Sequence, residues 1–111
     1  MTDLADQNCV PLHGEQHRLR AEQARAQLAE LGGWTLKGAA ASISREYHFP
    51  DYARTIAFVN AIAAMAEAQD HHPDLEVGYG RCVVRYNTHD VGGLSQNDFI
   101  CAAKADALAG S

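Results

Sequence analysis

The sequence predicts an α+β fold, a two-layer sandwich in which a four-stranded antiparallel sheet carries three helices on one face. The expected elements follow the order helix, strand, strand, long helix, strand, strand, helix. Each pair of strands is joined by a short segment of small or turn-forming residues, which favours antiparallel hairpins. Hairpins that alternate with helices are typical of a sheet that buries one face beneath its helices.

The N-terminal part of the chain predicts an arm followed by a helix. Residues 1–14 show no hydrophobic periodicity, so we expect a loose arm before a single domain over residues 15–111. Glu15–Leu31 is rich in Ala, Leu, Glu, Gln and Arg, which have high helix propensity. Gly32 and Gly33 can end this helix in a left-handed conformation.

Two strands are expected next. Trp34–Lys37 predicts a short strand, and Ser42–Phe49 alternates with the period of two that is typical of a half-buried strand. Tyr47 and Phe49 are expected to point inward, with Arg45 as a charged exception on the same face. The small residues between the two strands can form the hairpin connection.

The long helix over residues 52–69 is the most strongly predicted element. Asp51 can cap its N-terminus. Pro73 disfavours the helical conformation of the residue before it, so the helix is expected to end near Asp70 or His71. Apolar residues recur along it at helical spacing: Ile56, Phe58, Val59, Ile62, Ala63, Met65 and Ala66.

The C-terminal part predicts a second pair of strands and a last helix. The strands are Leu75–Tyr79 and Cys82–Thr88, separated by turn-forming residues. Ser95–Leu108 is the last helix. Alternate residues of the second strand are expected to face the core: Cys82, Val84 and Tyr86. The opposite face then carries Val83, Arg85, Asn87 and His89.

Composition argues against several classes of function. The net charge is −5 and the few Lys and Arg residues are scattered, so we expect no nucleic-acid partner. No apolar run approaches the roughly 20 residues of a membrane span, and the acidic N-terminus does not resemble a signal peptide. Cys9, Cys82 and Cys101 form neither a CxxC pair nor a disulfide framework, which favours free thiols in the cytoplasm.

Two adjacent histidines stand at the expected end of the long helix, in the sequence DHHPD over Asp70–Asp74. The negative pole of a helix favours protonated imidazole, and Glu67 and Asp70 are near enough in sequence to reinforce this effect. A histidine that titrates near neutral pH is a candidate general acid. The alternative interpretation is a basic helix cap, for which histidine is an ordinary residue.

A third histidine, His89, follows the last strand within NTHD. Together with His71 and His72 it could bind zinc, or it could take part in proton transfer. Adjacent histidines rarely point at one ion, but spacing alone does not separate these two interpretations. Ser95 and Asp98 form the pattern of a capping box, which favours a structural role for Asp98.

The stretch AEAQDHHPDLEVGYGRCVVRYNTHDVGGLSQNDFICAAKAD closely resembles the pterin-4a-carbinolamine dehydratase family. The resemblance covers about residues 17–109, and the upstream REYHFPDYARTIAFVNAIA is similar to the aromatic strand and long helix of that family. The residues that match the family motif stand in register: Glu67, His71-His72-Pro73, Thr88-His89, Gly93-Leu94-Ser95 and Asp98.

This resemblance implies a cytoplasmic dehydratase that converts 4a-hydroxytetrahydropterin into quinonoid dihydropterin. It implies tetrahydropterin recycling beside an aromatic amino-acid hydroxylase, with no metal or organic cofactor, in a homodimer or homotetramer. It assigns His71 and His89 as acid and base, and His72 as a residue that holds the substrate. Further residues are expected to bind the pterin or orient the imidazoles: Glu67, Asp70, Pro73, Asn87 and Thr88.

Two alternatives to this enzymatic interpretation are a non-catalytic family member that interacts with another protein and a small metal-binding domain. The intact set of three histidines argues against the first. The open edges of a four-stranded sheet, the outward-facing Val83 and the Ala-rich last helix favour association into a homo-oligomer.

Overall fold

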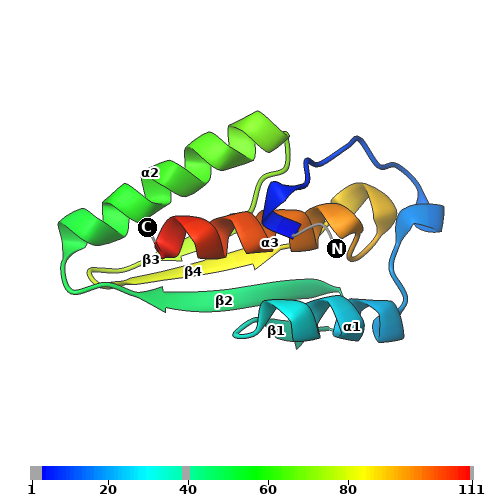
Figure 1. Ribbon diagram of the computed structural model, residues 1–111, viewed down its shortest axis with the longest axis horizontal. Helices are drawn as coiled ribbons and strands as arrows, with labels where there is room; N and C mark the ends of the chain where they lie inside the picture. The colour runs from blue at the N-terminus through cyan, green and yellow to red at the C-terminus, as the bar shows by residue number, and fades with distance from the viewer. Residues whose placement is uncertain (1–3, 39–40, 111) are drawn as a thin grey trace.

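A computed structural model describes residues 4–38 and 41–110 of the chain (Figure 1). One antiparallel sheet runs in the order β1-β2-β4-β3. Its strands are β1 (Thr35–Lys37), β2 (Ser42–His48), β3 (Asp74–Val77) and β4 (Arg81–Tyr86). The helices are α1 (Ala21–Leu31), α2 (Tyr52–Gln69) and α3 (Gln96–Ala109), with short 3-10 turns at Leu4–Asp6, Glu15–His17 and His89–Val91. The predicted α+β fold with a four-stranded antiparallel sheet is confirmed.

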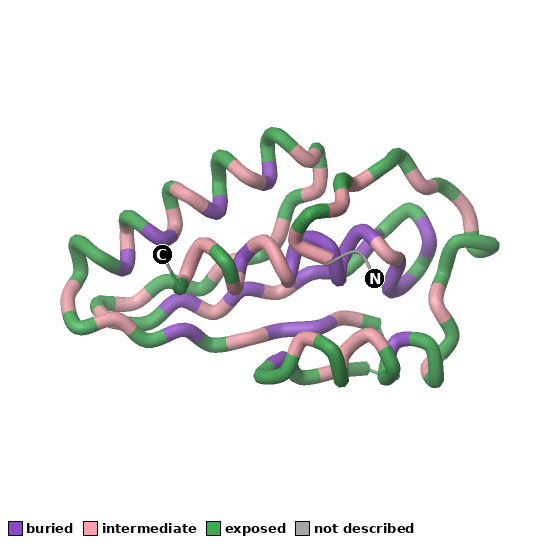
Figure 2. Tube along the Cα trace, viewed as in Figure 1, coloured by how far each residue is buried: buried purple, intermediate pink, exposed green. Residues whose placement is uncertain are grey.

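The core lies between the sheet and the three helices. Helix α3 contacts both other helices and lies between them (Figure 1). Most of the strand residues predicted to face inward are buried, as the purple segments of β2 and β4 show (Figure 2). Arg45 is half-buried, and so is Phe49, which lies just beyond the end of β2. The opposite face of the sheet carries exposed polar side chains such as Glu46 and Arg81. This contrast fixes the register, because a shift by one residue would expose every inward side chain. The buried strand residues are Ile43, Tyr47, Cys82, Val84 and Tyr86.

Helix α2 begins and ends as its sequence predicts. Asp51 caps it, accepting a hydrogen bond from the Arg54 amide at 2.8 Å. At the other end Asp70 adopts a left-handed conformation with φ 51°, and its amide bonds to the carbonyls of Ala66 and Glu67. Asp70 is the only non-glycine residue with positive φ in the described part of the chain. Aspartate enters this region more readily than most residues, so the chain can turn sharply here.

The first helix starts later than the sequence predicts. Residues Glu15–His17 form only a 3-10 turn, and α1 begins at Ala21. The amide of Leu19 donates to the carbonyl of Leu94 at 2.8 Å, which holds this stretch extended. The side chain of Gln23 accepts from the Arg20 amide at 2.8 Å and satisfies a backbone donor at the true helix start. Local propensity could not reveal a start that a distant backbone contact determines.

Residues 4–14 of the N-terminal arm pack on the domain, although a loose segment is expected from the sequence; residues 1–3 of the arm lie outside the described residues. Asn97 of α3 accepts from the Val10 amide at 3.2 Å and donates to the Val10 carbonyl at 2.7 Å. Gln69 of α2 accepts from the Cys9 amide at 2.7 Å. Two side-chain amides thus satisfy backbone groups that a loose arm would leave to water. The connection between β1 and β2 also includes residues 39 and 40, which lie outside the described residues.

Candidate active site

The candidate site lies where the end of α2 meets the end of β4. The left-handed turn at Asp70 reverses the chain, and the His71 amide bonds back to the Ala66 carbonyl at 3.1 Å. Pro73 favours an extended conformation at His72, so consecutive side chains point to opposite sides. The side chain of His71 is accordingly 12% exposed and that of His72 is 54% exposed. One imidazole therefore enters the protein and its neighbour stays at the surface.

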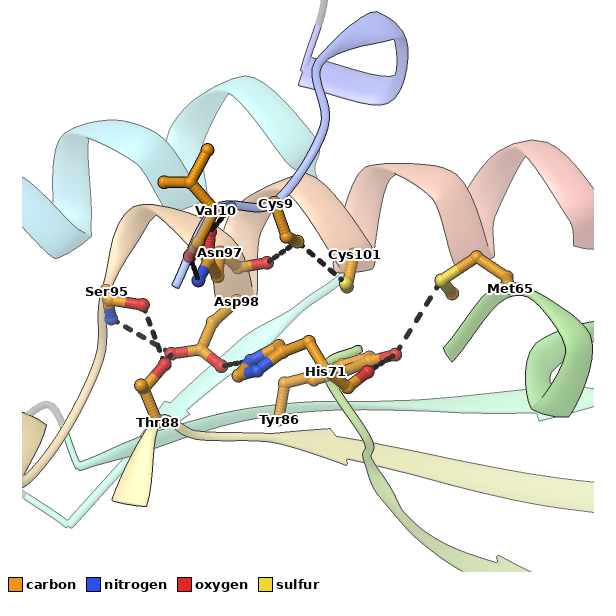
Figure 3. Close-up of polar contacts among 10 residues, drawn as sticks. All are labelled: Cys9, Val10, Met65, His71, Tyr86, Thr88, Ser95, Asn97, Asp98 and Cys101. Carbon is orange, nitrogen blue, oxygen red and sulfur yellow. Dashed lines mark hydrogen bonds and ion pairs between the residues drawn. The ribbon is translucent and has the colours of Figure 1, made fainter. Parts of the chain in front are cut away.

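The inward imidazole binds a buried carboxylate. His71 Nε2 lies 2.6 Å from Asp98 Oδ1, and the side chain of Asp98 is completely buried (Figure 3). The other oxygen, Oδ2, accepts from Thr88 Oγ1 at 2.8 Å and from the Ser95 amide at 2.9 Å. The hydroxyls of Thr88 and Ser95 also share a hydrogen bond at 2.7 Å. An ionised carboxylate only accepts hydrogen bonds, and both of its oxygens have donors here.

Tyr86 completes the surroundings of the imidazole. Its ring stacks on His71 with centroids 5.3 Å apart and an interplanar angle of 15° (Figure 3). Stacking and the bond to Asp98 together hold the plane of the imidazole. No residue in the described ranges hydrogen-bonds His71 Nδ1, so this nitrogen is available for proton exchange with a ligand.

The charge state of His71 follows from two opposed effects. Burial on its own would lower the pKa of His71. The hydrogen bond and negative charge of Asp98 raise it, Cys9 and Asp70 add to this effect, and the resulting pKa lies above the ordinary histidine value. A larger fraction of His71 is therefore protonated at neutral pH than for a free imidazole. Such a group is suited to donate a proton to a leaving hydroxyl.

The other predicted histidines lie at the surface. His72 Nε2 pairs with Glu67 Oε1 at 2.7 Å, and both side chains are largely exposed. His89 is exposed at the start of the 3-10 turn after β4, and no hydrogen bond of its ring occurs among the described residues. Pro73 is half-buried, and Asn87 is exposed beyond the last residue of β4. Among the described residues, none of these four side chains hydrogen-bonds Asp98.

A cleft of about 370 Å³ opens beside His71. Residues 9–13 of the N-terminal arm form one wall, and residues 68–71, Thr88, Asp90 and Asn97 form the rest. Its size falls in the range of small-molecule sites, about 300–1,000 Å³. Of the predicted site residues, Asp70, His71 and Thr88 line this cleft. The remaining predicted residues lie outside its lining, and their roles stay predictions: Glu67, His72, Pro73, Asn87 and His89.

Asp98 is a functional candidate whose local sequence pattern indicates only a structural role. The capping box predicted for Ser95 and Asp98 is present at the start of α3. The same carboxylate also binds His71, which the local pattern could not show because 27 residues separate the two. The available signal was the position of Asp98 within the family motif. The arm that walls the cleft carried no comparable signal.

Two further properties concern metal ions and membranes. Within residues 4–38 and 41–110, no group of three or more His, Cys, Asp or Glu side chains is placed to hold a metal ion. Over the same described ranges, every helix is too short or too polar to cross a membrane.

Comparison with solved structures shows the class of protein to which this fold belongs. The fold is similar to the crystal structure of a transcriptional coactivator/pterin dehydratase from Brucella melitensis, with a TM-score of 0.79 and 32% identity. That similarity covers 83% of this chain and 98% of the other. A pterin dehydratase-like protein identified as a RuBisCO assembly factor in the alpha-carboxysome is 30% identical, with a TM-score of 0.62, over 71% of this chain and 92% of its own. The chain has the pterin dehydratase fold.

The family follows from the sequence comparisons. The family model described as Pterin 4 alpha carbinolamine dehydratase matches residues 17–108, and the chain belongs to this family. A relative from Xanthomonas oryzae pv. oryzae, named "Putative pterin-4-alpha-carbinolamine dehydratase", is 52% identical over 97% of this chain and 94% of its own length. A relative of the same name from Stenotrophomonas maltophilia is 52% identical over 95% of this chain and 90% of its own. The resemblance read from the sequence is confirmed.

Proposed function

We propose that this protein removes water from 4a-hydroxytetrahydropterin to give quinonoid dihydropterin. The observation that carries the proposal is the hydrogen-bonded pair of His71 and the buried Asp98, in which His71 lines a cleft large enough for a pterin in a member of this family. In this proposal the enzyme recycles tetrahydropterin in the cytoplasm beside an aromatic amino-acid hydroxylase. Elimination of water involves no net oxidation or reduction, so proton transfer suffices and no cofactor is required.

The proposed mechanism divides the proton transfers between two histidines. Elimination across the N5–C4a bond needs an acid for the hydroxyl that leaves C4a and a base for the proton on N5. His71 is the acid, because its pKa is raised and its Nδ1 is available. His89 is the base, and His72, which pairs with Glu67, holds the pterin. General acid and base catalysis each contribute about 10²–10⁴-fold.

A dehydration assay tests this proposal. Catalytic amounts of the protein should accelerate the decay of the carbinolamine, followed by ultraviolet absorbance. A His71→Gln variant should lose about 10²-fold or more in turnover. His48→Gln is the matched control, since His48 is an exposed histidine on β2 that pairs with Glu46 and lies outside the cleft. Failure of the wild-type protein to accelerate decay, or full turnover by His71→Gln, would reject the assignment.

A second candidate function is the assembly of, or interaction with, another protein. It is favoured by the similarity to the pterin dehydratase-like assembly factor. The hydrogen-bonded His71–Asp98 pair in an open cleft favours catalysis instead, because a purely structural role would not need an accessible imidazole nitrogen there. A folded protein without dehydratase activity would support the second candidate.

A further inference from the structure

Two cysteines meet where the N-terminal arm crosses α3. Cys9 of the arm and Cys101 of α3 are separated by 92 positions in the sequence, and their sulfur atoms lie 3.4 Å apart (Figure 3). Cys101 is completely buried, and Cys9 is half-buried and lines the cleft. The third cysteine, Cys82, is buried in β4, and no thiol of the described residues contacts it. The proposed dehydratase chemistry uses none of these thiols.

We propose that Cys9 and Cys101 are a redox-active pair that a hydroperoxide converts into an intramolecular disulfide. The disulfide would tie the N-terminal arm covalently to α3 at the wall of the cleft. A disulfide has a sulfur–sulfur bond of about 2.05 Å, so the two atoms need to approach by roughly 1.4 Å. The arm can supply this movement because side-chain hydrogen bonds, and no helix or sheet ladder, hold Cys9 in place.

The two thiols differ in a way that assigns their roles. The hydrogen bond from Cys101 lowers the pKa of Cys9, and the positive charges of His71 and Lys104 act in the same direction against the effect of burial. The bond to Cys9 and burial raise the pKa of Cys101. The thiolate is the reactive form of cysteine, so Cys9 is the attacking residue and Cys101 the resolving one.

The oxidation then proceeds in two balanced steps. The Cys9 thiolate attacks the O–O bond of the hydroperoxide, which forms an S–O bond and releases hydroxide or alkoxide. The Cys101 thiol next attacks the Cys9 sulfur, which forms the S–S bond and expels the oxygen as water with the thiol proton. Two thiols lose two electrons and the hydroperoxide gains them. Peroxide can reach Cys9 through the cleft that this residue lines.

The disulfide should make the arm harder to detach. The amides of Cys9 and Val10 bond to the side chains of Gln69 and Asn97, and they exchange with solvent when the arm lifts away. A covalent link prevents this opening, so exchange at both amides should slow by about tenfold or more. The cleft would then keep its arm wall in oxidised protein.

The test uses the full-length reduced protein and hydrogen peroxide. After treatment, free thiols are blocked with iodoacetamide, counted in the unfolded chain and located by peptide mass. Reactive thiols should fall from three to one, and the Cys9 and Cys101 peptides should be linked with the loss of two hydrogen atoms. Dithiothreitol should restore all three thiols.

Two variants make the test specific. Cys9→Ser changes a half-exposed residue and should abolish the disulfide, whereas Cys82→Ala should leave it unchanged. Because Cys101 is buried, its replacement could disturb α3, and the test does not depend on it. Three thiols after peroxide treatment, a sulfinic acid at Cys9 in place of the linked peptide, or links only between chains would each overturn the proposal.

Discussion

Replacing Asp98 by Asn removes the charge beside His71 and leaves the shape of the side chain nearly unchanged. In the wild-type protein Oδ1 faces His71 Nε2, and Oδ2 accepts from Thr88 and Ser95. In the D98N variant the amide oxygen can keep the bonds at the Oδ2 position, which places the amide NH₂ against His71. The NH₂ donates only to an unprotonated Nε2, so the imidazole must be neutral with its proton on Nδ1.

The expected loss of stability is small and the expected loss of activity is large. A hydrogen bond to a charged group contributes about 1.5–3 kcal/mol and a neutral one about 0.5–1.5 kcal/mol. The Thr88 hydroxyl and the Ser95 amide keep an acceptor in D98N, so the free energy of unfolding should fall by only about 1–2 kcal/mol. Loss of the protonated acid should lower turnover by about 10²–10⁴-fold.

The assay measures turnover, stability and the His71 titration on the same samples. Carbinolamine decay gives turnover, urea unfolding gives stability, and imidazole NMR should show a lower His71 pKa in D98N than in the wild-type protein. D106N is the matched control, because Asp106 is also an α3 carboxylate and binds Trp34 and Arg45 outside the cleft. It should lose stability and keep its turnover. Turnover of D98N within about two-fold of wild type, or an unchanged His71 titration, would refute the reasoning.

Three further predictions concern the pH dependence of stability, the two surface histidines and the oligomeric state. Because the pKa of His71 is higher in the folded than in the unfolded protein, protonation of His71 stabilises the fold. This stabilisation is complete below the unfolded-state histidine pKa of about 6.5, and it is lost as the pH rises through the folded-state pKa. The difference in unfolding free energy between wild type and D98N should therefore shrink as pH rises through that window, and a difference that stays constant would contradict it. His89→Ala should lower kcat by about 10²-fold, whereas His72→Ala should mainly raise KM; unchanged kinetics in both would remove them from the site. Light scattering at micromolar concentration should give a multiple of 12.0 kDa, and a mass of 12.0 kDa itself would contradict the expected homo-oligomer.

The sequence predicts well those helices and strands whose determining residues lie close together in the chain. The caps at Asp51 and Ser95 act within three residues of themselves, and the alternation of β4 depends only on its own side chains. The inward charge expected at Arg45 is also present, and its partner is Asp106 at 3.0 Å. That partner was not predictable, because 61 positions separate the two residues. The alternation of a strand predicts which face of the sheet a residue occupies, but the partner of that residue depends on how distant parts of the chain pack.

The N-terminal arm shows the opposite case. Its backbone bonds to Asn97 and Gln69 join residues 60 or more positions apart, and no periodicity in the arm accompanies them. Any polar segment could make such bonds, so its composition does not separate a docked arm from a loose one. The wall of the cleft was therefore absent from the predicted site.

The contact between Asp98 and His71 could not be predicted from the sequence pattern for a related reason. Its carboxylate closes the capping box with Ser95 and at the same time binds His71, so one residue serves both the start of α3 and the charge of the imidazole. A local pattern that is fully explained by helix capping gives no sign of a second partner. The two roles separate chemically, because capping requires only an acceptor and raising the pKa of His71 requires a negative charge. An amide can satisfy the first requirement and not the second, which is why Asn distinguishes the roles and Ala, which removes both, does not.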